Sequence, residues 1–195
     1  MTGRGADEKS FFMRIYGNRL IQTLPGSQIR PTTGKVRQAL FNIWQGTILG
    51  CHWLDLCAGN GSMGAEALAR GAKQVIGMDK SPLACKIIQQ NWQKIAQSEQ
   101  TFQVICGDVI ALIPRVKSQK FDRIYLDPPY ASGLYDSILT AIAENQLLAS
   151  DGDIAVEHDP KQWQAGKIRG LKKYREKRYG KTGLTFFQLA EETII

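Results

Sequence analysis

The chain has 195 residues and carries 25 Lys and Arg against 18 Asp and Glu, which gives a formal net charge of +7. This length favours a single domain, 1–195, that buries a substantial core. No stretch approaches the roughly 18 apolar residues that a membrane helix needs, and the polar residues 1–9 lack the apolar region of a signal peptide. We therefore expect a cytoplasmic protein that does not span a membrane. The four cysteines form no CxxC pair and the two histidines have no companion at ligand spacing, so we expect reduced thiols and no metal.

The first elements along the chain are a small hairpin and a helix. Residues 11–15 and 19–23 predict two short strands with Gly17 and Asn18 in the turn. Thr32 or Thr33 then caps a helix in which apolar residues recur at helical spacing, and this spacing places Arg37 off the apolar face.

A buried strand at residues 53–57 leads into a glycine-rich turn, 58–64, and then into a helical pattern. Gly59 and Gly61 allow the backbone to approach a ligand closely, and the helix that follows offers free N–H groups. Together with Gly64 they match the dinucleotide fingerprint, which is a weak signal by itself. Asp55, inside the strand, can hold the turn or meet a cationic ligand, and it favours an ammonium-bearing cofactor such as S-adenosylmethionine over a nicotinamide dinucleotide.

Two further strands end in acidic residues. Residues 74–79 predict a strand that ends at Asp79, whose carboxylate can accept from two ribose hydroxyls, and residues 102–108 predict a strand that ends at Asp108, which can accept from an adenine amine. The alternation of strands and helices predicts a parallel sheet. With Asp55, three successive strands each present a carboxylate.

A proline turn closes the apolar run 121–126. Asp127-Pro128-Pro129-Tyr130 cannot continue a helix or pair as a central strand, because proline has no N–H to donate. The turn therefore lies beyond the C-terminal edge of a strand, where open α/β sheets keep their active sites. It places a carboxylate, backbone carbonyls and an aromatic ring in a small space, which suits a flat, amine-bearing group such as a nucleobase or an amide. The alternative is that the segment is only a strand followed by a proline turn, with Tyr130 there by chance.

The last elements are a strand at 153–157 and a closing hairpin around 180–183. Residues 1–50 hold seven Lys and Arg against two acids, residues 51–160 nine against thirteen, and residues 161–195 nine against three. Because Lys and Arg supply most non-specific nucleic-acid affinity, the two basic ends predict contact with RNA, although a solvated face would have a similar composition. The predicted RNA-binding residues are Arg14, Arg19, Arg30, Arg37, Lys172, Lys173, Arg175, Lys177 and Arg178.

Over nearly its whole length the chain resembles the RsmD-type 16S rRNA (guanine-N2) methyltransferases of bacteria. The resemblance lies in residues 30–32 and 36–43, in residues 54–72 and in the Asp127-Pro128-Pro129-Tyr130 turn. The chain departs mildly from the family at Cys57, Asn60 and Asp79, where Phe, Ser and Glu are more usual. The resemblance implies an α/β, Rossmann-like class I methyltransferase fold: a mostly parallel, seven-stranded sheet with a C-terminal antiparallel hairpin. A small N-terminal β-hairpin extension, 1–30, would precede a catalytic core, 31–195.

The resemblance implies S-adenosylmethionine-dependent methylation of the N2 amine of a guanine in 16S rRNA, by a protein that we expect to be a monomer and that acts on the rRNA or the small ribosomal subunit. Asp127 and the Pro128 carbonyl would accept the amine hydrogens, and Tyr130 would stack on the base, so Asp127, Pro128, Pro129 and Tyr130 are the predicted catalytic residues. The predicted cofactor-binding residues are Asp55, Cys57, Ala58, Gly59, Gly61, Gly64, Asp79, Lys80, Ser81, Gly107, Asp108 and Val109.

Three alternatives stay open at this point. N6-adenine methyltransferases of DNA or RNA use the same kind of proline turn, and the turn alone does not distinguish one exocyclic amine from another. Enzymes that methylate a glutamine amide in protein carry a related turn, often with Asn where this chain has Asp127. A non-catalytic RNA-binding assembly factor with a vestigial cofactor site is the third, and the retained carboxylates and glycines argue against it.

Overall fold

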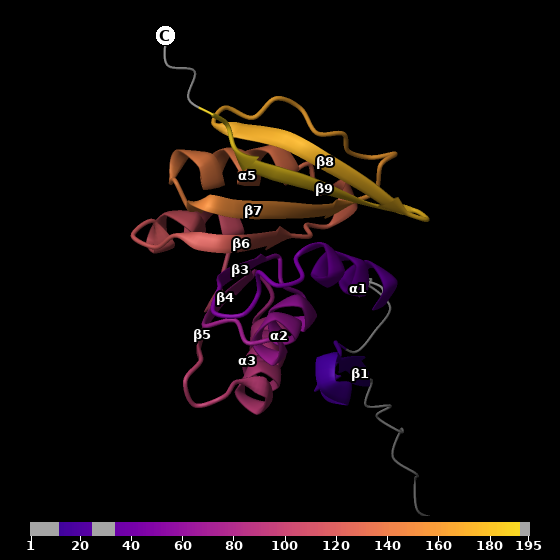
Figure 1. Ribbon diagram of the computed structural model, residues 1–195, viewed down its shortest axis with the longest axis vertical. Helices are drawn as coiled ribbons and strands as arrows, with labels where there is room; N and C mark the ends of the chain where they lie inside the picture. The colour runs from indigo at the N-terminus through magenta and orange to yellow at the C-terminus, as the bar shows by residue number, and fades with distance from the viewer. Residues whose placement is uncertain (1–11, 25–33, 192–195) are drawn as a thin grey trace, which may run out of the picture.

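The computed structural model describes residues 12–24 and 34–191. Its centre is a seven-stranded sheet of order β5-β4-β3-β6-β7-β9-β8 (Figure 1). The parallel strands are β3 (His52–Leu56), β4 (Gln74–Asp79), β5 (Thr101–Cys106), β6 (Phe121–Leu126) and β7 (Leu148–His158). β9 (Thr182–Leu189) runs antiparallel between β7 and β8 (Leu171–Tyr179). The predicted mostly parallel sheet with a closing antiparallel hairpin is thereby confirmed.

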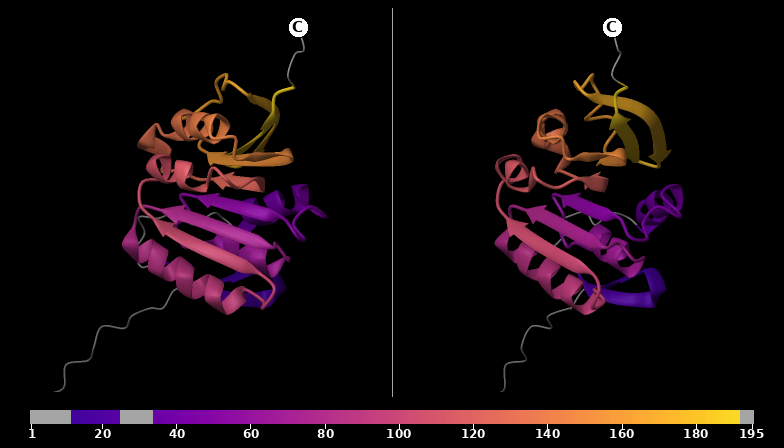
Figure 2. Two further views of the ribbon diagram at one scale, coloured as in Figure 1. Left: turned by 90° about the vertical axis from the view of Figure 1, so that its left-hand side faces the viewer. Right: turned by 60° about the vertical axis from the view of Figure 1, so that its left-hand side comes forward.

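Helices cover both faces of the sheet (Figure 2). One hydrophobic cluster joins the sheet to α1 (Gly34–Ile43), α2 (Ser62–Ala69) and α3 (Pro82–Ile95), and the other joins it to α4 (Val109–Leu112), the 3₁₀ turn η2 (Ile113–Val116) and α5 (Tyr135–Glu144). Successive side chains of a strand point to opposite faces. Trp53 and Val75 therefore belong to the first cluster, and Leu54 and Ile76 to the second.

The N-terminal hairpin consists of β1 (Phe12–Ile15) and β2 (Arg19–Gln22), joined by the 3₁₀ turn η1 (Tyr16–Asn18). Gly17 and Asn18 adopt positive φ values of 70° and 61° in the predicted turn. The hairpin contacts α2 and α3, at the end of the molecule opposite the β8–β9 hairpin (Figure 1). Arg30 and the predicted helix caps Thr32 and Thr33 lie outside the described residues.

Helix α1 buries Arg37 together with Val36, Leu40 and Phe41. The prediction that Arg37 lies off the apolar face was wrong. Its guanidinium lies 3.2 Å from a carboxylate oxygen of Glu66 on α2, a partner 29 residues away that helical spacing could not reveal. A buried charge is tolerated when it is paired in this way.

The C-terminal ends of β3, β4, β5 and β6 meet at one edge of the sheet. Strand order reverses between β3 and β6, and open α/β sheets bind ligands at such a switch point. The glycine-rich turn follows β3 and the proline turn follows β6, so the two motifs are neighbours. Within the described residues, no helix has the length and apolar character needed to cross a membrane.

Candidate active site

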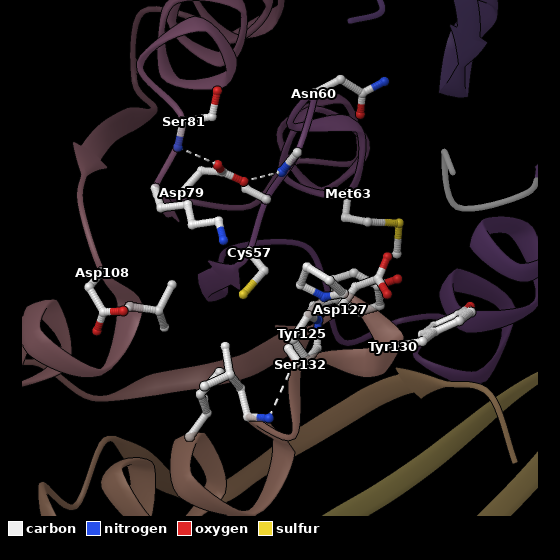
Figure 3. Close-up of a pocket in the computed structure, with 18 of the residues that line it drawn as sticks. Cys57, Asn60, Met63, Asp79, Ser81, Asp108, Tyr125, Asp127, Tyr130 and Ser132 are labelled. Atoms are coloured by element: carbon white, nitrogen blue, oxygen red, sulfur yellow. Dashed lines mark hydrogen bonds between the residues drawn. The ribbon is translucent and has the colours of Figure 1, made fainter. Parts of the chain in front are cut away.

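A cavity of about 470 Å³ opens at this edge, a volume typical of small-molecule sites (Figure 3). It joins the glycine-rich turn, the ends of β4 and β5 and the proline turn. The residues that line it are Cys57, Ala58, Gly59, Asn60, Ser62, Met63, Asp79, Lys80, Ser81, Asp108, Val109, Ile110, Tyr125, Asp127, Pro128, Pro129, Tyr130, Ser132, Leu134 and Ile138.

Asp79 organises the cofactor half of the cavity. One carboxylate oxygen accepts from the backbone N–H of Gly59 at 2.8 Å, and the other accepts from the N–H of Ser81, the N-cap of α3, at 2.9 Å (Figure 3). Each carboxylate oxygen has two lone pairs, so Asp79 keeps acceptor capacity for two ligand hydroxyls. This geometry suits the predicted ribose contact.

Asp55 lies beneath the turn and does not line the cavity. It is 1% exposed, and one of its oxygens accepts from the N–H of Gly64 at 2.9 Å. The other oxygen is buried and has no hydrogen-bond partner among the described residues. Burial raises the pKa of Asp55 to about 8. Of the two roles that the sequence left open, the hydrogen bond to Gly64 fits the holding of the turn.

Gly61 and Gly64 are packing glycines as well as turn residues. A Cβ at Gly61 would lie 2.8 Å from Nε1 of the Trp92 indole, and one at Gly64 would lie 2.2 Å from its Cζ2. Neither glycine lines the cavity. The glycine spacing that resembles a dinucleotide fingerprint is therefore explained in part by contact between α2 and α3.

The end of β5 closes the other side of the cofactor half. The side chain of Asp108 caps α4 by accepting from the N–H of Ala111 at 3.1 Å, and Val109 follows it along the cavity wall. Gly107, with a φ of 150°, does not line the cavity and instead donates to the Asp79 carbonyl at 2.9 Å. Gly107, which was predicted to bind the cofactor, therefore contacts Asp79 and not the cavity.

Cys57 lies between Asp79 and Asp127 in the middle of the cavity (Figure 3). Burial, helped by the carboxylates of Asp79 and Asp127, raises the pKa of the Cys57 thiol to about 12. The thiol is therefore neutral, which excludes a thiolate nucleophile at this position. The four cysteines, all within the described residues, are free thiols in this structure.

The proline turn forms the other half of the cavity. The N–H of Asp127 donates to the Leu56 carbonyl at 3.3 Å, which ties this turn to the end of β3. The Pro128 carbonyl is 3.5 Å from the hydroxyl of Tyr135, whose pKa is raised by burial, so the phenol stays protonated and donates. Asp127 and Tyr130 are half-buried and line the cavity together.

Most of the predicted RNA-binding residues are at the surface. Arg14 is exposed on β1, and Lys172, Lys173, Lys177 and Arg178 are exposed along β8. The guanidinium of Arg175 lies 5.9 Å from the ring centre of Phe186. Arg19 is half-buried, and the buried Arg37 is engaged by Glu66 and by the Arg14 carbonyl. Arg37 therefore supports the hairpin instead of presenting a charge to RNA.

Several cavity residues were not predicted. Tyr125, on β6, donates to Glu157 at 2.5 Å, and Ser132 and Leu134 follow the proline turn. Met63 and Ile138 contribute apolar surface from α2 and α5. The alternation of β6 could have shown that Tyr125 and Asp127 share a strand face. No sequence signal indicates which helix residues reach the cavity.

Comparison with known proteins decides the family. A family model described as "Conserved hypothetical protein 95" matches residues 13–188. The chain belongs to this family, the RsmD-like methyltransferases. The predicted resemblance is thereby confirmed.

Members of the RsmD-like family and their structures match along most of the chain. "Putative rRNA methyltransferase YlbH" of Bacillus subtilis is 32% identical over 87% of this chain and 93% of its own length. "Ribosomal RNA small subunit methyltransferase D" of Haemophilus influenzae is 29% identical over 89% and 95%. A crystal structure titled "putative methylase HI0767", also from Haemophilus influenzae, has a TM-score of 0.76 at 27% identity and covers 93% of this chain and all of its own.

The RsmD-like family and its fold make S-adenosylmethionine the cofactor of this site. The cavity fits this cofactor. The glycine-rich turn and the N-terminus of α2 follow β3, Asp79 with its spare acceptor capacity ends β4, and Asp108, which caps α4, follows β5. The described residues contain no group of three or more His, Cys, Asp or Glu side chains arranged to hold a metal ion.

Proposed function

We propose that this RsmD-like protein methylates the exocyclic N2 amine of a guanine in 16S rRNA. The observation that carries the proposal is one continuous cavity. In it, the proline turn lies across from Asp79 and Asp108, the carboxylates predicted to bind the cofactor (Figure 3). The names of the relatives support rRNA as the substrate class.

The cofactor supplies a methyl group bonded to a positively charged sulfur, which is transferred as an electrophile. The residues of the chain prepare the nucleophile. The guanine amine is a poor nucleophile because its lone pair is delocalised into the ring. When Asp127 and the Pro128 carbonyl each accept one amine hydrogen, the remaining lone pair is directed away from both acceptors, towards the cofactor half.

The surroundings of Pro128 favour this role. The protonated Tyr135 phenol donates to the Pro128 carbonyl, occupying one lone pair, and the carbonyl retains its second for the amine. Asp127 accepts the proton late, because the amine becomes acidic only as its new bond to carbon forms. Positioning and preorganised acceptors supply most of the acceleration.

A guanine in structured RNA must leave its stack to enter such a cavity. The exposed basic residues of β8, together with Arg14 on the hairpin, supply positive charge at both ends of the molecule (Figure 1). A second, open hollow beside β8 is lined by Lys167, Arg169, Lys172 and Lys173, which extends the basic surface. These sites suit phosphates on either side of a displaced nucleotide.

The first test is a transfer assay with methyl-labelled S-adenosylmethionine. Separate reactions contain naked 16S rRNA, small ribosomal subunits that lack the modification, duplex DNA and a protein extract. Label in N2-methylguanosine supports the proposal. Label in N6-methyladenine or in a protein amide overturns the substrate, and the absence of label from every reaction, with cofactor bound, supports a binding role.

The second test replaces Asp127 with Asn, which keeps the shape and removes the charge. We expect turnover to fall at least about a hundredfold with cofactor affinity largely retained, the usual loss when a group acting in the transition state is removed. Asp151→Asn is the matched control, because Asp151 is exposed on β7 and does not line the cavity. Near-normal turnover of the Asp127 variant would exclude the assigned role.

A further inference from the structure

The N-terminal hairpin is hydrogen-bonded to the glycine-rich turn through one buried side chain. Asn91, on α3, is 0% exposed. Its amide oxygen accepts from the N–H of Gln22 on β2 at 2.8 Å. Its amide nitrogen donates to the Gln22 carbonyl at 2.9 Å and to the Asn60 carbonyl, in the turn, at 3.0 Å. One side chain thus joins the backbone of the hairpin to the backbone of the turn.

Asn60 makes a second connection from the cavity side. Its amide nitrogen lies 3.2 Å from the sulfur of Met13 on β1, and its amide oxygen accepts from the N–H of Ser62, the first residue of α2, at 3.2 Å. Asn60 lines the cavity, and its side chain points away from the cavity centre (Figure 3). A shift of this turn is therefore transmitted to both strands of the hairpin.

The hairpin is also attached to the helix that follows the turn. The N–H of Tyr16 donates to Glu66, on α2, at 3.0 Å, and Arg37 donates from its guanidinium to both Glu66 and the Arg14 carbonyl. The hairpin therefore contacts α2 and α3, the two helices that start at the cofactor half of the cavity. Because polar groups are costly to bury without partners, undocking of the hairpin would carry the cost of breaking these contacts.

We infer that the N-terminal hairpin supports the cofactor site from outside the cavity, with Asn91 as the positioning residue that couples hairpin docking to S-adenosylmethionine binding. A cofactor that holds the turn in the conformation seen here also holds the Asn60 carbonyl opposite Asn91, and Asn91 in turn holds Gln22. The coupling is reciprocal: a docked hairpin strengthens cofactor binding by the same factor by which the cofactor strengthens docking. An exposed appendage would show no such dependence.

Hydrogen exchange tests the coupling without RNA or methyl transfer, so its outcome is independent of the proposed substrate. Amide exchange of peptides covering residues 12–22 is measured by mass spectrometry, with and without saturating S-adenosylhomocysteine, the demethylated product of the cofactor. For the natural protein we expect exchange in the hairpin to slow about fivefold or more, at the lower end of ordinary coupling. For Asn91→Ala we expect little change, and a loss of cofactor-product affinity by a similar factor in calorimetry.

Two further variants separate coupling from a general loss of structure. Met13→Leu conserves volume and removes only the sulfur acceptor, so we expect reduced slowing in a fully folded protein. Gln100→Ala is the matched control, because the Gln100 amide also bridges two backbone carbonyls, those of Leu68 and Ala72, away from the hairpin. It is expected to keep the full slowing. Equal slowing in the natural protein and in Asn91→Ala, or no slowing in the natural protein, would overturn the coupling.

Discussion

Replacing Gly64 with Ala tests the contact between α2 and α3 that shapes the cofactor turn. The new Cβ would lie 2.2 Å from Cζ2, 2.8 Å from Cε2 and 2.9 Å from Cη2 of Trp92. Carbon atoms pack at about 3.5–4 Å, so the indole must move by more than about 1 Å. Trp92 is fully buried and its Nε1 donates to the Gly61 carbonyl at 2.8 Å, so the movement also disturbs the turn.

The magnitude follows from two opposing effects. Overpacking of a filled core costs about 1–3 kcal/mol, and this overlap belongs at the upper end. Alanine is favoured over glycine inside a helix by about 1 kcal/mol. We therefore expect the free energy of unfolding, measured by urea denaturation, to fall by about 2 kcal/mol, together with a loss of affinity for S-adenosylmethionine measured by calorimetry. Gly34→Ala is the control, because a Cβ added at Gly34 meets nothing within 4 Å.

A double-mutant cycle with Trp92→Phe identifies the contact. Phenylalanine lacks the outer indole atoms that Gly64→Ala would strike, so the two changes together should cost at least about 0.5 kcal/mol less than the sum of the single losses. Additive losses, or a Gly64→Ala protein within about 0.5 kcal/mol of the natural one, would refute the packing explanation.

Three further perturbations test other parts of the site. The pKa of Asp55 rises from 3.8 to about 8 on folding, so the unfolded chain releases its proton first and stability falls as pH rises between those values. In urea titrations at several pH values, Asp55→Asn should reduce the fall of the unfolding free energy with pH. An unchanged dependence on pH would contradict the raised pKa of Asp55. Glu66→Ala leaves Arg37 buried without its partner and should cost about 3–5 kcal/mol in the same assay, whereas a loss below about 1 kcal/mol would contradict a paired buried charge. RNA affinity should weaken and depend less on salt, in filter binding at several salt concentrations, when glutamine replaces the basic residues of β8, namely Lys172, Lys173, Arg175, Lys177 and Arg178. An unchanged salt dependence would place the RNA elsewhere.

The sequence predicted the parts of the fold that follow from local pattern. Buried strands, the glycine-rich turn and the proline turn each depend on neighbouring residues, and the carboxyl ends of parallel strands necessarily meet at one edge. This was enough to predict Asp79, Asp108 and Asp127 along one edge of the sheet, where all three line the cavity.

The remaining features depend on partners distant in sequence. Arg37 is buried because Glu66 faces it, Gly64 is required by Trp92, and Asn91 reaches Gln22 across 69 residues. Helical spacing describes which residues share a face and contains no information on what that face meets. For the same reason, the sequence does not distinguish Asn91 from an ordinary polar residue of a helix.

The position of β8 at the margin of the sheet gives its basic residues a second consequence. β8 pairs with β9 on one side and is the last strand in the order of the described sheet. A long outer strand offers its backbone to strands of other molecules, and lysine side chains discourage such pairing and the aggregation that follows. The resistance to aggregation and the proposed RNA contact would therefore depend on the same side chains. Substitutions that remove charge along β8 are therefore expected to promote aggregation, even where they have no effect on methyl transfer.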